Sequence, residues 1–297
     1  MQEKIDARLL ALVGNCQEAS LREAMLYSIS AGGKRLRPML LLAACEAVSG
    51  TYGQNVLDFA CALEMIHTYS LIHDDLPAMD NDDFRRGKPS SHIKFGESMA
   101  ILAGDALLNR AFETMAGACA DISSYEEDSG SHSKMSYLRN AEAMLIIAAA
   151  AGDNGMIAGQ VCDIHFQNKK LDADTLFNIH SRKAGALFAA ALEAGAVLGG
   201  ASLVNVQAMK QAGAKMGWAF QILDDLLDVT ATQEELGKPV NSDSRNQKNT
   251  YVSVHGLEAA KADYARISAE VLADFNRLPQ KTETLRDIVQ QAIDRKN

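Results

Sequence analysis

Five aspartates lie within ten residues in the first third of the chain. They are Asp74, Asp75, Asp80, Asp82 and Asp83. Acidic runs of this kind usually mark a solvent-exposed helix end. Here an apolar helical pattern continues into the aspartates without a polar break, so we expect the carboxylates at the end of a buried helix. Carboxylates held near a core need a cation, and hard oxygen ligands favour Mg²⁺ or Ca²⁺ over zinc.

The spacing of this acidic cluster distinguishes between the two cations. An EF-hand calcium loop that began at Asp80 would need glycine at its sixth position, and that position is Arg85. Magnesium usually binds a few carboxylates together with waters and the phosphates of a substrate. We therefore predict a magnesium site and a phosphorylated ligand.

A second acidic motif occurs at residues 221–228. Its sequence, Gln-Ile-Leu-Asp-Asp-Leu-Leu-Asp, repeats the Ile-x-Asp-Asp-Leu pattern of residues 72–76. On a helix Asp224 and Asp228 share a face, and Gln221 lies one turn before them. One such motif can arise by chance in an acidic helix. Two copies beside apolar runs predict two helices that face each other across a cavity, with metal ions bridging a polyanion between them.

The first motif cannot be a regular helix throughout. Asp74 and Asp80 are six residues apart, which on a helix separates them by roughly 120°. Pro77 lies between them and cannot continue the helical hydrogen bonds. We predict a bulged or broken turn that brings Asp80 back toward Asp74.

A basic segment lies between two predicted helices near the N-terminus. Two consecutive glycines are expected to end one helix, and Pro38 suits the first turn of the next. Lys34, Arg35 and Arg37 then lie at a helix N-terminus, where cations are unfavourable unless an anion binds. The segment is interpreted as a diphosphate clamp, and a basic loop is the alternative.

Four further basic side chains have both a structural and a functional interpretation. His67 precedes Asp74 by two helical turns and faces the same way, although a single histidine on a helix is usually structural. Arg85 and Arg86 either neutralise the aspartates or grip phosphate with bidentate hydrogen bonds. Lys183, at the entrance of an apolar helix, is either a surface residue with a buried stem or an anion ligand. The sequence leaves these alternatives open.

The composition of the 297-residue chain favours helices. It is 47% hydrophobic and contains only five prolines and few aromatic residues. Apolar helical patterns resume on both sides of a Ser-rich loop expected at residues 121–137, so we predict a single all-α domain that spans residues 1–297. The net charge of −9 argues against nucleic acid as a partner.

Neither a disulfide nor a membrane span is expected. The five cysteines are odd in number and lack C-x-x-C spacing, as is typical of small buried residues in a reducing cytosol. The longest apolar stretch, residues 184–204, is about the length of a membrane span but carries Glu193 near its middle. An acid there costs roughly 2.5–3.5 kcal/mol in lipid. We predict a buried core helix and a cytoplasmic protein.

With these motifs in this order, the sequence resembles the short-chain trans-isoprenyl diphosphate synthases, and most closely those of the bacterial farnesyl diphosphate synthase type. The resemblance covers essentially the whole chain, from Gly33-Lys-Arg through both aspartate motifs. It implies a single all-α domain of antiparallel helices around a deep central cavity, usually as a homodimer. It also implies a reaction that condenses isopentenyl diphosphate with dimethylallyl or geranyl diphosphate. This reaction requires Mg²⁺, with three ions in all.

The resemblance implies a role for each motif residue. The expected Mg²⁺ ligands are Asp74, Asp80 and Asp224, with Asp75 and Asp228 as supporting acids. The residues expected to bind isopentenyl diphosphate are Lys34, Arg37, His67 and Arg86. The residues expected to hold the allylic diphosphate are Arg85, Lys183, Gln221 and Lys238, and Lys183 joins the three metal ligands as a catalytic residue. Two departures from the family pattern are Ala184, where threonine is common, and the loop after Lys238, which has less glycine.

The chemistry implied by the resemblance is ionisation followed by addition. Metal ions and basic side chains stabilise the departing pyrophosphate as a developing anion. The isopentenyl double bond attacks the allylic cation, and the pyrophosphate takes the released proton, since no catalytic triad or acid–base pair is visible in the sequence. Apolar helices are expected to exclude water that would quench the cation.

The product length depends on the residue five positions before the first aspartate. That residue is Tyr69, followed by Ser70, and a bulky side chain here blocks chain growth in the family. The implied product is farnesyl diphosphate (C15), with geranylgeranyl diphosphate (C20) as the alternative. A terpene cyclase would carry Asn-Asp-x-x-Ser-x-x-x-Glu as its second motif, and a non-catalytic partner subunit would have lost one aspartate motif. Neither description matches this chain.

Overall fold

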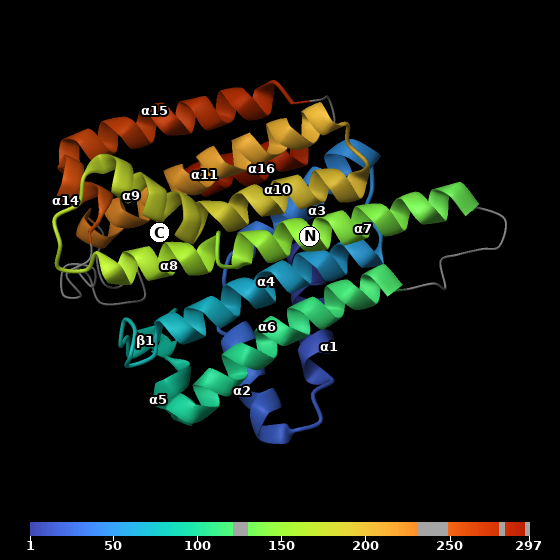
Figure 1. Cartoon of the computed structure of the whole chain (residues 1–297), viewed down its shortest axis with the longest axis horizontal. Coiled ribbons are helices and arrows are strands. Elements are labelled where there is room, and N and C mark those ends of the chain that lie inside the picture. The colour runs from blue at the N-terminus through green and yellow to red at the C-terminus, as the bar shows by residue number, and fades with distance from the viewer. Residues whose placement is uncertain (121–129, 231–248, 279–282, 295–297) are drawn as a thin grey trace.

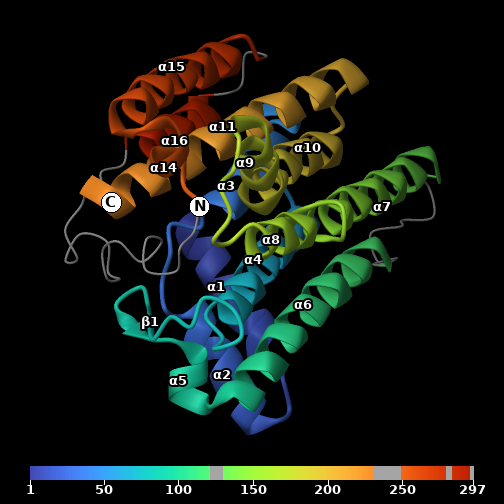
Figure 2. The same ribbon diagram turned by 60° about the vertical axis from the view of Figure 1, so that its left-hand side comes forward.

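The computed structural model describes residues 1–120, 130–230, 249–278 and 283–294, with the side chains of the second range described from residue 135 onward. In these ranges the chain is built almost wholly from α-helices (Figure 1). Helices α15 and α16 lie on one side of the molecule and α1, α2 and α6 on the other, with α3, α4, α10 and α11 between them (Figures 1 and 2). The all-α prediction is therefore confirmed.

The first half of the chain contains helices α1 to α6, and α4 among them ends at the first acidic motif. They are α1 (Gln2–Gly14), α2 (Ala19–Ile29), α3 (Leu36–Ser49), α4 (Gln54–Asp74), α5 (Ser91–Phe95) and α6 (Glu97–Ala120). A short antiparallel ribbon, β1 (Phe84–Arg85) and β2 (Lys88–Pro89), lies between α4 and α5. Its turn residues Arg86 and Gly87 have φ of 52° and 73°. This is the left-handed backbone that a two-residue hairpin turn requires.

The second half begins with α7 and ends with α16. Its elements are α7 (Gly130–Ala151), α8 (Met156–His165), α9 (Ala173–His180), the π-helical turn η2 (Ser181–Gly185), α10 (Ala186–Gly199), α11 (Leu203–Thr230), α14 (Tyr251–His255), α15 (Leu257–Asn276) and α16 (Glu283–Ile293). The prediction of a loop over residues 121–137 is wrong from Gly130 onward, because α7 begins there. Adding a residue to a formed helix is much easier than starting one, so the apolar part of α7 extends into a polar sequence.

Helix α10 lies at the centre of the core and packs against α3, α7 and α11. Apart from Glu193, which pairs with Lys210, its residues are apolar or glycine, as is typical of a core helix. Its contact with α3 is close: a Cβ on Gly195 would lie 2.3 Å from the carbonyl oxygen of Leu41. The predicted stretch over residues 184–204 is buried in α10, which ends at Gly199, short of a membrane span, whereas Leu203 and Val204 are exposed at the start of α11.

One other stretch of the described chain, Met135–His165, is long and apolar enough to cross a membrane by length and composition alone, with a mean hydropathy of 1.3. The helix is interrupted within it, because α7 ends at Ala151 and α8 begins at Met156. Such a stretch also occurs in the helices of proteins that do not enter membranes. It is weak evidence for a span.

Candidate active site

The first acidic motif lies at the C-terminal end of α4, where the helix gives way to a tight turn. Helix α4 ends at Asp74, and the backbone N–H of Asp80 donates to the carbonyl oxygen of Asp74 at 2.8 Å. Pro77 lies in the intervening turn, on the surface. This contact confirms the predicted broken turn that returns Asp80 to Asp74. Both residues are half-buried, so their carboxylates remain within reach of a ligand.

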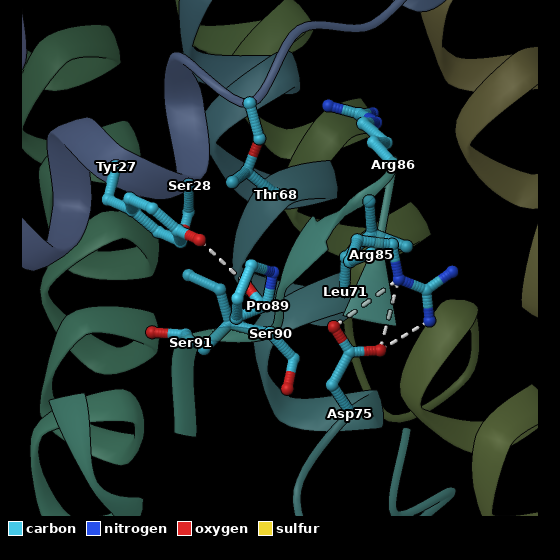
Figure 3. Close-up of a pocket in the computed structure, with 12 residues that line it drawn as sticks. Tyr27, Ser28, Thr68, Leu71, Asp75, Arg85, Arg86, Pro89, Ser90 and Ser91 are labelled. Atoms are coloured by element: carbon cyan, nitrogen blue, oxygen red, sulfur yellow. Dashed lines mark hydrogen bonds and ion pairs between the residues drawn. The ribbon is translucent and has the colours of Figure 1, made fainter. Parts of the chain in front are cut away.

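Asp75, the second aspartate of this motif, points away from solvent and pairs with Arg85 of β1 (Figure 3). The guanidinium donates through Nε to the Asp75 carboxylate at 3.0 Å and 3.3 Å, and Nη2 donates to the same carboxylate. Asp75 is 2% exposed. Burial raises its pKa to about 6 although the charge and hydrogen bonds of Arg85 lower it. Burial alone would lower the pKa of Arg85. The charge of Asp75 and its hydrogen bonds to the guanidinium outweigh burial and raise that pKa.

Lys183 approaches the first motif from the π-helical turn η2. Its Nζ donates to Oδ2 of Asp163 on α8 at 2.6 Å. Burial lowers the pKa of Lys183, but the negative charges of Asp163, Asp74 and Asp80 and the hydrogen bond to Asp163 outweigh it and raise the pKa. Helix α8 comes this close because it has glycine at the contact: a Cβ on Gly159 would lie 2.3 Å from the backbone nitrogen of Lys183. The structure therefore places Lys183 beside the first acidic motif.

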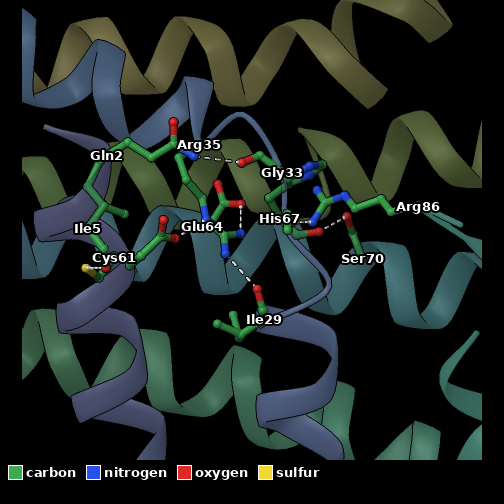
Figure 4. A network of polar contacts seen from close by, with 12 residues as sticks. Gln2, Ile5, Ile29, Gly33, Arg35, Cys61, Glu64, His67, Ser70 and Arg86 are labelled. Atoms are coloured by element: carbon green, nitrogen blue, oxygen red, sulfur yellow. Dashed lines mark hydrogen bonds and ion pairs between the residues drawn. The ribbon is translucent and has the colours of Figure 1, made fainter. Parts of the chain in front are cut away.

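A second group of basic side chains gathers around His67 of α4, two helical turns before Asp74. Nη1 of Arg86 donates to the carbonyl oxygen of Gly32, and the guanidinium is against Gly33, where a Cβ would lie 2.8 Å from it (Figure 4). Burial lowers the pKa of His67 well below its usual value, and the positive charges of Arg37 and Arg86 lower it further. The imidazole is therefore neutral near pH 7, and three of the four residues expected to bind one diphosphate lie together.

Arg37 is held in the first turn of α3 by aromatic side chains. Its Cζ lies 4.5 Å from the ring centroid of Phe188 on α10 and 5.9 Å from that of Phe220 on α11. Cation–π contacts of this kind orient a guanidinium without consuming its hydrogen-bond donors. Lys34, the fourth expected residue, is exposed in the segment between α2 and α3.

Arg35 does not belong to the basic cluster in the way the sequence implied. Its side chain is 4% exposed and donates to Glu64 at 2.9 Å, to Asp6 at 2.8 Å and to the carbonyl oxygen of Ile29 (Figure 4). The interpretation of Arg35 as part of an anion clamp is therefore wrong. With a backbone φ of 47° at the start of α3, its side chain enters the core, where Glu64 is its buried counter-charge.

The second acidic motif lies near the C-terminal end of α11. Asp224 is half-buried, whereas Asp225 and Asp228 are buried. Nε2 of Gln221 donates to Oδ1 of Asp225 at 2.8 Å, and the backbone N–H of Tyr251 donates to its Oδ2 at 2.6 Å. Nε2 of His180 lies 3.7 Å from the same oxygen. Burial lowers the pKa of His180 to about 4, so it is neutral near pH 7.

The segment from His180 to Lys183 connects the two acidic motifs. His180 contacts Asp225 of the second motif, and three residues later Lys183 experiences the charges of Asp74 and Asp80 of the first. Helix α11 packs closely on this segment, because a Cβ on Gly217 would lie 2.6 Å from Cα of Gly185. Both motif-bearing helix ends also lie on the same side of the molecule, near β1 and α14 (Figure 1).

The oxygen donors at these two helix ends suit a hard cation. Asp74, Asp80 and Asp224 are half-buried carboxylates, and such groups prefer Mg²⁺ to softer metals. Among the described residues, no group of three or more His, Cys, Asp or Glu side chains converges closely enough to hold a metal alone. A bound Mg²⁺ would therefore need ligand oxygens from elsewhere, as expected of an ion that is completed by water and substrate phosphates.

Tyr69 lies on α4 below the first motif. It is 6% exposed, and its ring packs edge-on against His73 with centroids 5.7 Å apart. The His73 ring in turn lies against α6, where a Cβ on Gly104 would be 2.2 Å from its Nε2. The hydroxyl of Ser70 donates to the carbonyl oxygen of His67 at 2.8 Å. Burial raises the pKa of Tyr69, and so does the charge of Asp74, as expected for a phenol next to the acidic motif.

Two polar residues at the site were missed in the sequence. Asp163 is the hydrogen-bond partner of Lys183, and Asp225 is the partner of Gln221 and Tyr251. The i to i+4 spacing of Gln221 and Asp225 could have indicated their contact. Nothing local predicts the contact of Asp163 with a lysine 20 residues away. Lys238 lies outside the described residues, and Ala184 is buried beside Lys183.

Comparisons with known proteins agree with this arrangement. A profile of the polyprenyl synthetase family matches residues 18–291. The chain is 46% identical over 247 residues to a farnesyl diphosphate synthase of Geobacillus stearothermophilus, covering 83% of this chain and 79% of that protein. It is 45% identical over 251 residues to a chloroplastic geranylgeranyl pyrophosphate synthase of Capsicum annuum, covering 84% of this chain and 64% of that protein.

Solved structures show the same likeness. A Helicobacter pylori geranyltransferase, crystallised with magnesium and isoprenyl diphosphate, superposes with a TM-score of 0.81 at 34% identity, covering 97% of this chain and 93% of that chain. A Pyrococcus horikoshii geranylgeranyl pyrophosphate synthetase superposes with a TM-score of 0.85 at 30% identity, covering 99% and 96%. The chain belongs to the polyprenyl synthetase family of prenyltransferase enzymes.

Proposed function

We propose that this protein condenses isopentenyl diphosphate with dimethylallyl or geranyl diphosphate to give farnesyl diphosphate and pyrophosphate. The observation that carries the proposal is that Lys183 lies beside the first acidic motif at the end of α4, while Arg37, His67 and Arg86 form a second basic group. Two anionic substrates need two such sites, one of them next to the metal ligands. The relatives named above act on the same class of substrate.

In this proposal Asp74, Asp80 and Asp224 are the ligands of Mg²⁺, with three ions in all, and Asp75 and Asp228 support them. Bound Mg²⁺ would act as a Lewis acid on the oxygens of the allylic diphosphate. The solved relative that contains magnesium and isoprenyl diphosphate supports the choice of ion. The half-buried state of the three ligand carboxylates leaves them accessible to that ion.

The basic residues divide between the two diphosphates. Lys34, Arg37, His67 and Arg86 bind isopentenyl diphosphate, and Arg85, Lys183, Gln221 and Lys238 hold the allylic diphosphate. Neutral His67 donates one hydrogen bond, whereas Arg37 and Arg86 supply charge. Asp163 holds Lys183 in place at 2.6 Å, so its ammonium is oriented before the substrate arrives.

The reaction separates charge, and the protein stabilises the separated pyrophosphate. Lys183 and Arg85 face the diphosphate that leaves, which favours ionisation of the allylic carbon–oxygen bond. The isopentenyl double bond then forms the new carbon–carbon bond, and the released proton passes to the pyrophosphate. Apolar side chains of α4, α6 and α10 exclude water that would trap the cation.

The test uses purified protein, Mg²⁺, isopentenyl diphosphate and, in separate reactions, dimethylallyl and geranyl diphosphate. We expect pyrophosphate release and a C15 product with both starters, and no product when a chelator removes the metal. An active-site control is Lys183→Met, which keeps the length of the side chain but removes the charge. No prenyl product from the wild-type protein with either starter would contradict the proposal.

Product length is proposed to depend on Tyr69. Its buried ring packs against His73 near the first motif, and we expect it to meet a growing hydrocarbon chain. We expect Tyr69→Ala to shift the product from C15 toward C20, as measured by chromatography of the dephosphorylated products. Tyr69→Phe is the matched control, because it keeps the ring and should keep C15. An unchanged C15 product from Tyr69→Ala would show that Tyr69 does not limit the length of the product.

The second candidate function is geranylgeranyl diphosphate synthesis. It is favoured by two relatives that carry this name, one from Capsicum annuum and one from Pyrococcus horikoshii. The same chromatogram separates the two functions, because a C20 product from the wild-type protein would assign the alternative.

We further propose that the chain forms a single domain and a cytoplasmic homodimer. Large apolar side chains are exposed on adjacent helices, including Leu102 of α6, Leu145 of α7 and Val161 of α8. Exposed apolar side chains on neighbouring helices are often found at protein–protein interfaces. Light scattering after gel filtration should give twice the 32.0 kDa chain mass, and Leu145→Lys should reduce it to the monomer. A monomeric wild-type protein would contradict the dimer.

A further inference from the structure

Asp225 belongs to the second acidic motif but has no place among the proposed metal ligands. Its side chain is 2% exposed, and both carboxylate oxygens are engaged. Oδ1 accepts from Nε2 of Gln221 at 2.8 Å, and Oδ2 accepts from the backbone N–H of Tyr251 at 2.6 Å. Nε2 of His180 lies 3.7 Å from Oδ2 of Asp225. One of these contacts lies within α11, and the other two come from α14 and α9, which meet α11 at Asp225.

The Gln221 contact fixes the orientation of an amide that would otherwise be free to flip. A carboxylate only accepts hydrogen bonds, so the Gln221 amide must turn its NH₂ group toward Asp225. One N–H of that group is then used, and the second remains for another acceptor. On the helix Gln221 lies between Asp224 and Asp225, about 60° from the first and about 40° from the second. Gln221 therefore projects from α11 between the proposed metal ligand and Asp225.

The carboxylate is itself held in place by the start of α14. Tyr251 is the first residue of that helix, and Thr250 caps it with a reciprocal pair of hydrogen bonds to Ser253. The Tyr251 hydroxyl donates to Asp263 on α15 at 3.0 Å. Rotation of the Asp225 carboxylate would leave the Tyr251 N–H buried without an acceptor, which costs about 1–3 kcal/mol. Asp225 is thus a rigid acceptor.

We propose that Asp225 is a positioning residue: it binds no metal and orients Gln221 so that one amide N–H points at the allylic diphosphate. The inference rests on the proposed function, because it assumes that a diphosphate binds beside Asp224. It separates the two neighbouring aspartates of the motif into a metal ligand and an anchor. Replacement of Asp225 by asparagine should then turn the Gln221 amide around, with its carbonyl toward the new NH₂ group and toward the diphosphate site.

The test measures binding of inorganic pyrophosphate at saturating Mg²⁺ by calorimetry, together with thermal unfolding. The proteins are the wild type, Asp225→Asn, Gln221→Met and the double variant. Loss of one hydrogen bond to a charged group costs about 1.5–3 kcal/mol, so each single variant should raise the Kd roughly tenfold or more. The double variant should bind no more weakly than Gln221→Met, because Asp225 acts only through Gln221. The Mg²⁺ concentration at half-saturation should stay within about twofold of the wild type.

The matched control is Asp58→Asn. Asp58 on α4 accepts from Nε2 of Gln54 at 2.9 Å with the same i to i+4 spacing, and it also pairs with Arg8. It lies near the start of α4, sixteen residues before Asp74. This variant loses the same kind of contact and should lower the unfolding temperature without changing the Kd of pyrophosphate.

Each other outcome contradicts a particular part of the inference. Additive losses in the double variant would show that Asp225 does not act through Gln221. A large shift in the Mg²⁺ requirement would make Asp225 a metal ligand. If Asp225→Asn does not fold, Gln221→Met decides the matter alone, since an unchanged Kd there removes the role of the amide. A wild-type protein that binds no pyrophosphate with Mg²⁺ would instead overturn the proposed function, and the positioning role with it.

Discussion

At the end of α4, Asp75 faces a guanidinium, whereas in α11 the corresponding Asp225 faces an amide, a backbone N–H and a neutral imidazole. The two aspartates occupy the same place in the repeated Ile-x-Asp-Asp-Leu sequence, and both are 2% exposed. In each pair the first aspartate is half-buried and the second is buried. Asp75 and Asp225 are therefore equally buried, but they have different hydrogen-bond partners.

The difference shows how a repeated motif can be held by two kinds of chemistry. Arg85 neutralises Asp75 from a short ribbon that follows in sequence, so the first motif is closed by a local contact. Asp225 takes its partners from α9 and α14, so the second motif is closed by helices distant in sequence. A charged pair depends on both members being present, whereas several neutral donors share the stabilisation.

The largest expected effect concerns the first aspartate of each motif. The comparison predicts that replacing either one lowers activity by the same factor. Asp74→Ala and Asp224→Ala should each lower kcat/KM by about 10³-fold, because each removes a group that supports charge developing on the diphosphate. Unfolding temperatures should change little, since both side chains are only half-buried. Steady-state pyrophosphate release measures the effect. A loss confined to one motif would show that the two are not equivalent.

A smaller effect is expected where the motifs differ. Asp75→Asn leaves Arg85 without its carboxylate, and breaking a buried ion pair from one side costs about 3 kcal/mol. Denaturant unfolding of this variant, beside the conservative Asp82→Asn, measures the cost. Asp82 lies 3.5 Å from Arg85 and is more exposed, so its replacement should cost well under 1 kcal/mol. Equal losses in the two variants would show that Asp75 is not the principal partner.

The buried, neutral imidazole of His180 beside the second motif predicts a pH response. His180 faces Asp225, Asp163 and Lys183, and burial lowers its pKa to about 4. In the unfolded chain its pKa is about 6.5, so between pH 4 and 6.5 the unfolded state binds more protons. Stability from this group is therefore complete above pH 6.5 and is lost as the pH falls toward 4, by about 3 kcal/mol in total. The difference between the wild type and His180→Gln in unfolding free energy should follow this curve, and a flat difference would contradict it.

The smallest effect concerns the cap that presents Tyr251 to Asp225. Thr250→Ala removes the side-chain acceptor of the capping box and should cost about 1 kcal/mol. Thr250→Ser keeps the acceptor and is the matched control. Chemical denaturation of the three proteins measures the cost. Equal stability of Thr250→Ala and the wild type would mean that α14 is held by its tertiary contacts alone.

Much of this site follows from local sequence. Apolar periodicity placed α4 and α11 correctly, and Pro77 indicated the broken turn that returns Asp80 to Asp74. Two features do not follow from sequence. Arg35 and Arg37 are both basic residues at one helix start, and only the packing shows that one enters the core while the other lies on Phe188. Asp225 looks like its neighbour until helices far along the chain meet it.

The polar start of α7 was also beyond the reach of local reasoning. Serine-rich sequence is typical of loops, yet the helix begins at Gly130, ten residues before Asn140, the first buried residue among those of α7 whose side chains are described. Helix boundaries depend on the stability of the adjoining apolar part as much as on the residues at the boundary. Lys238, which the sequence placed at the allylic diphosphate, stays a prediction.

The π-helical turn at Ser181–Gly185 carries one extra residue per turn between two ordinary helices. Deleting a single residue there would let the chain continue as an uninterrupted α-helix, and everything on its N-terminal side would rotate by about 100° about the axis. His180 would then no longer contact Asp225, whereas the direction of Lys183 relative to α10 would not change. One surplus residue thus sets the angle between the side chain that meets the second acidic motif and the one that meets the first.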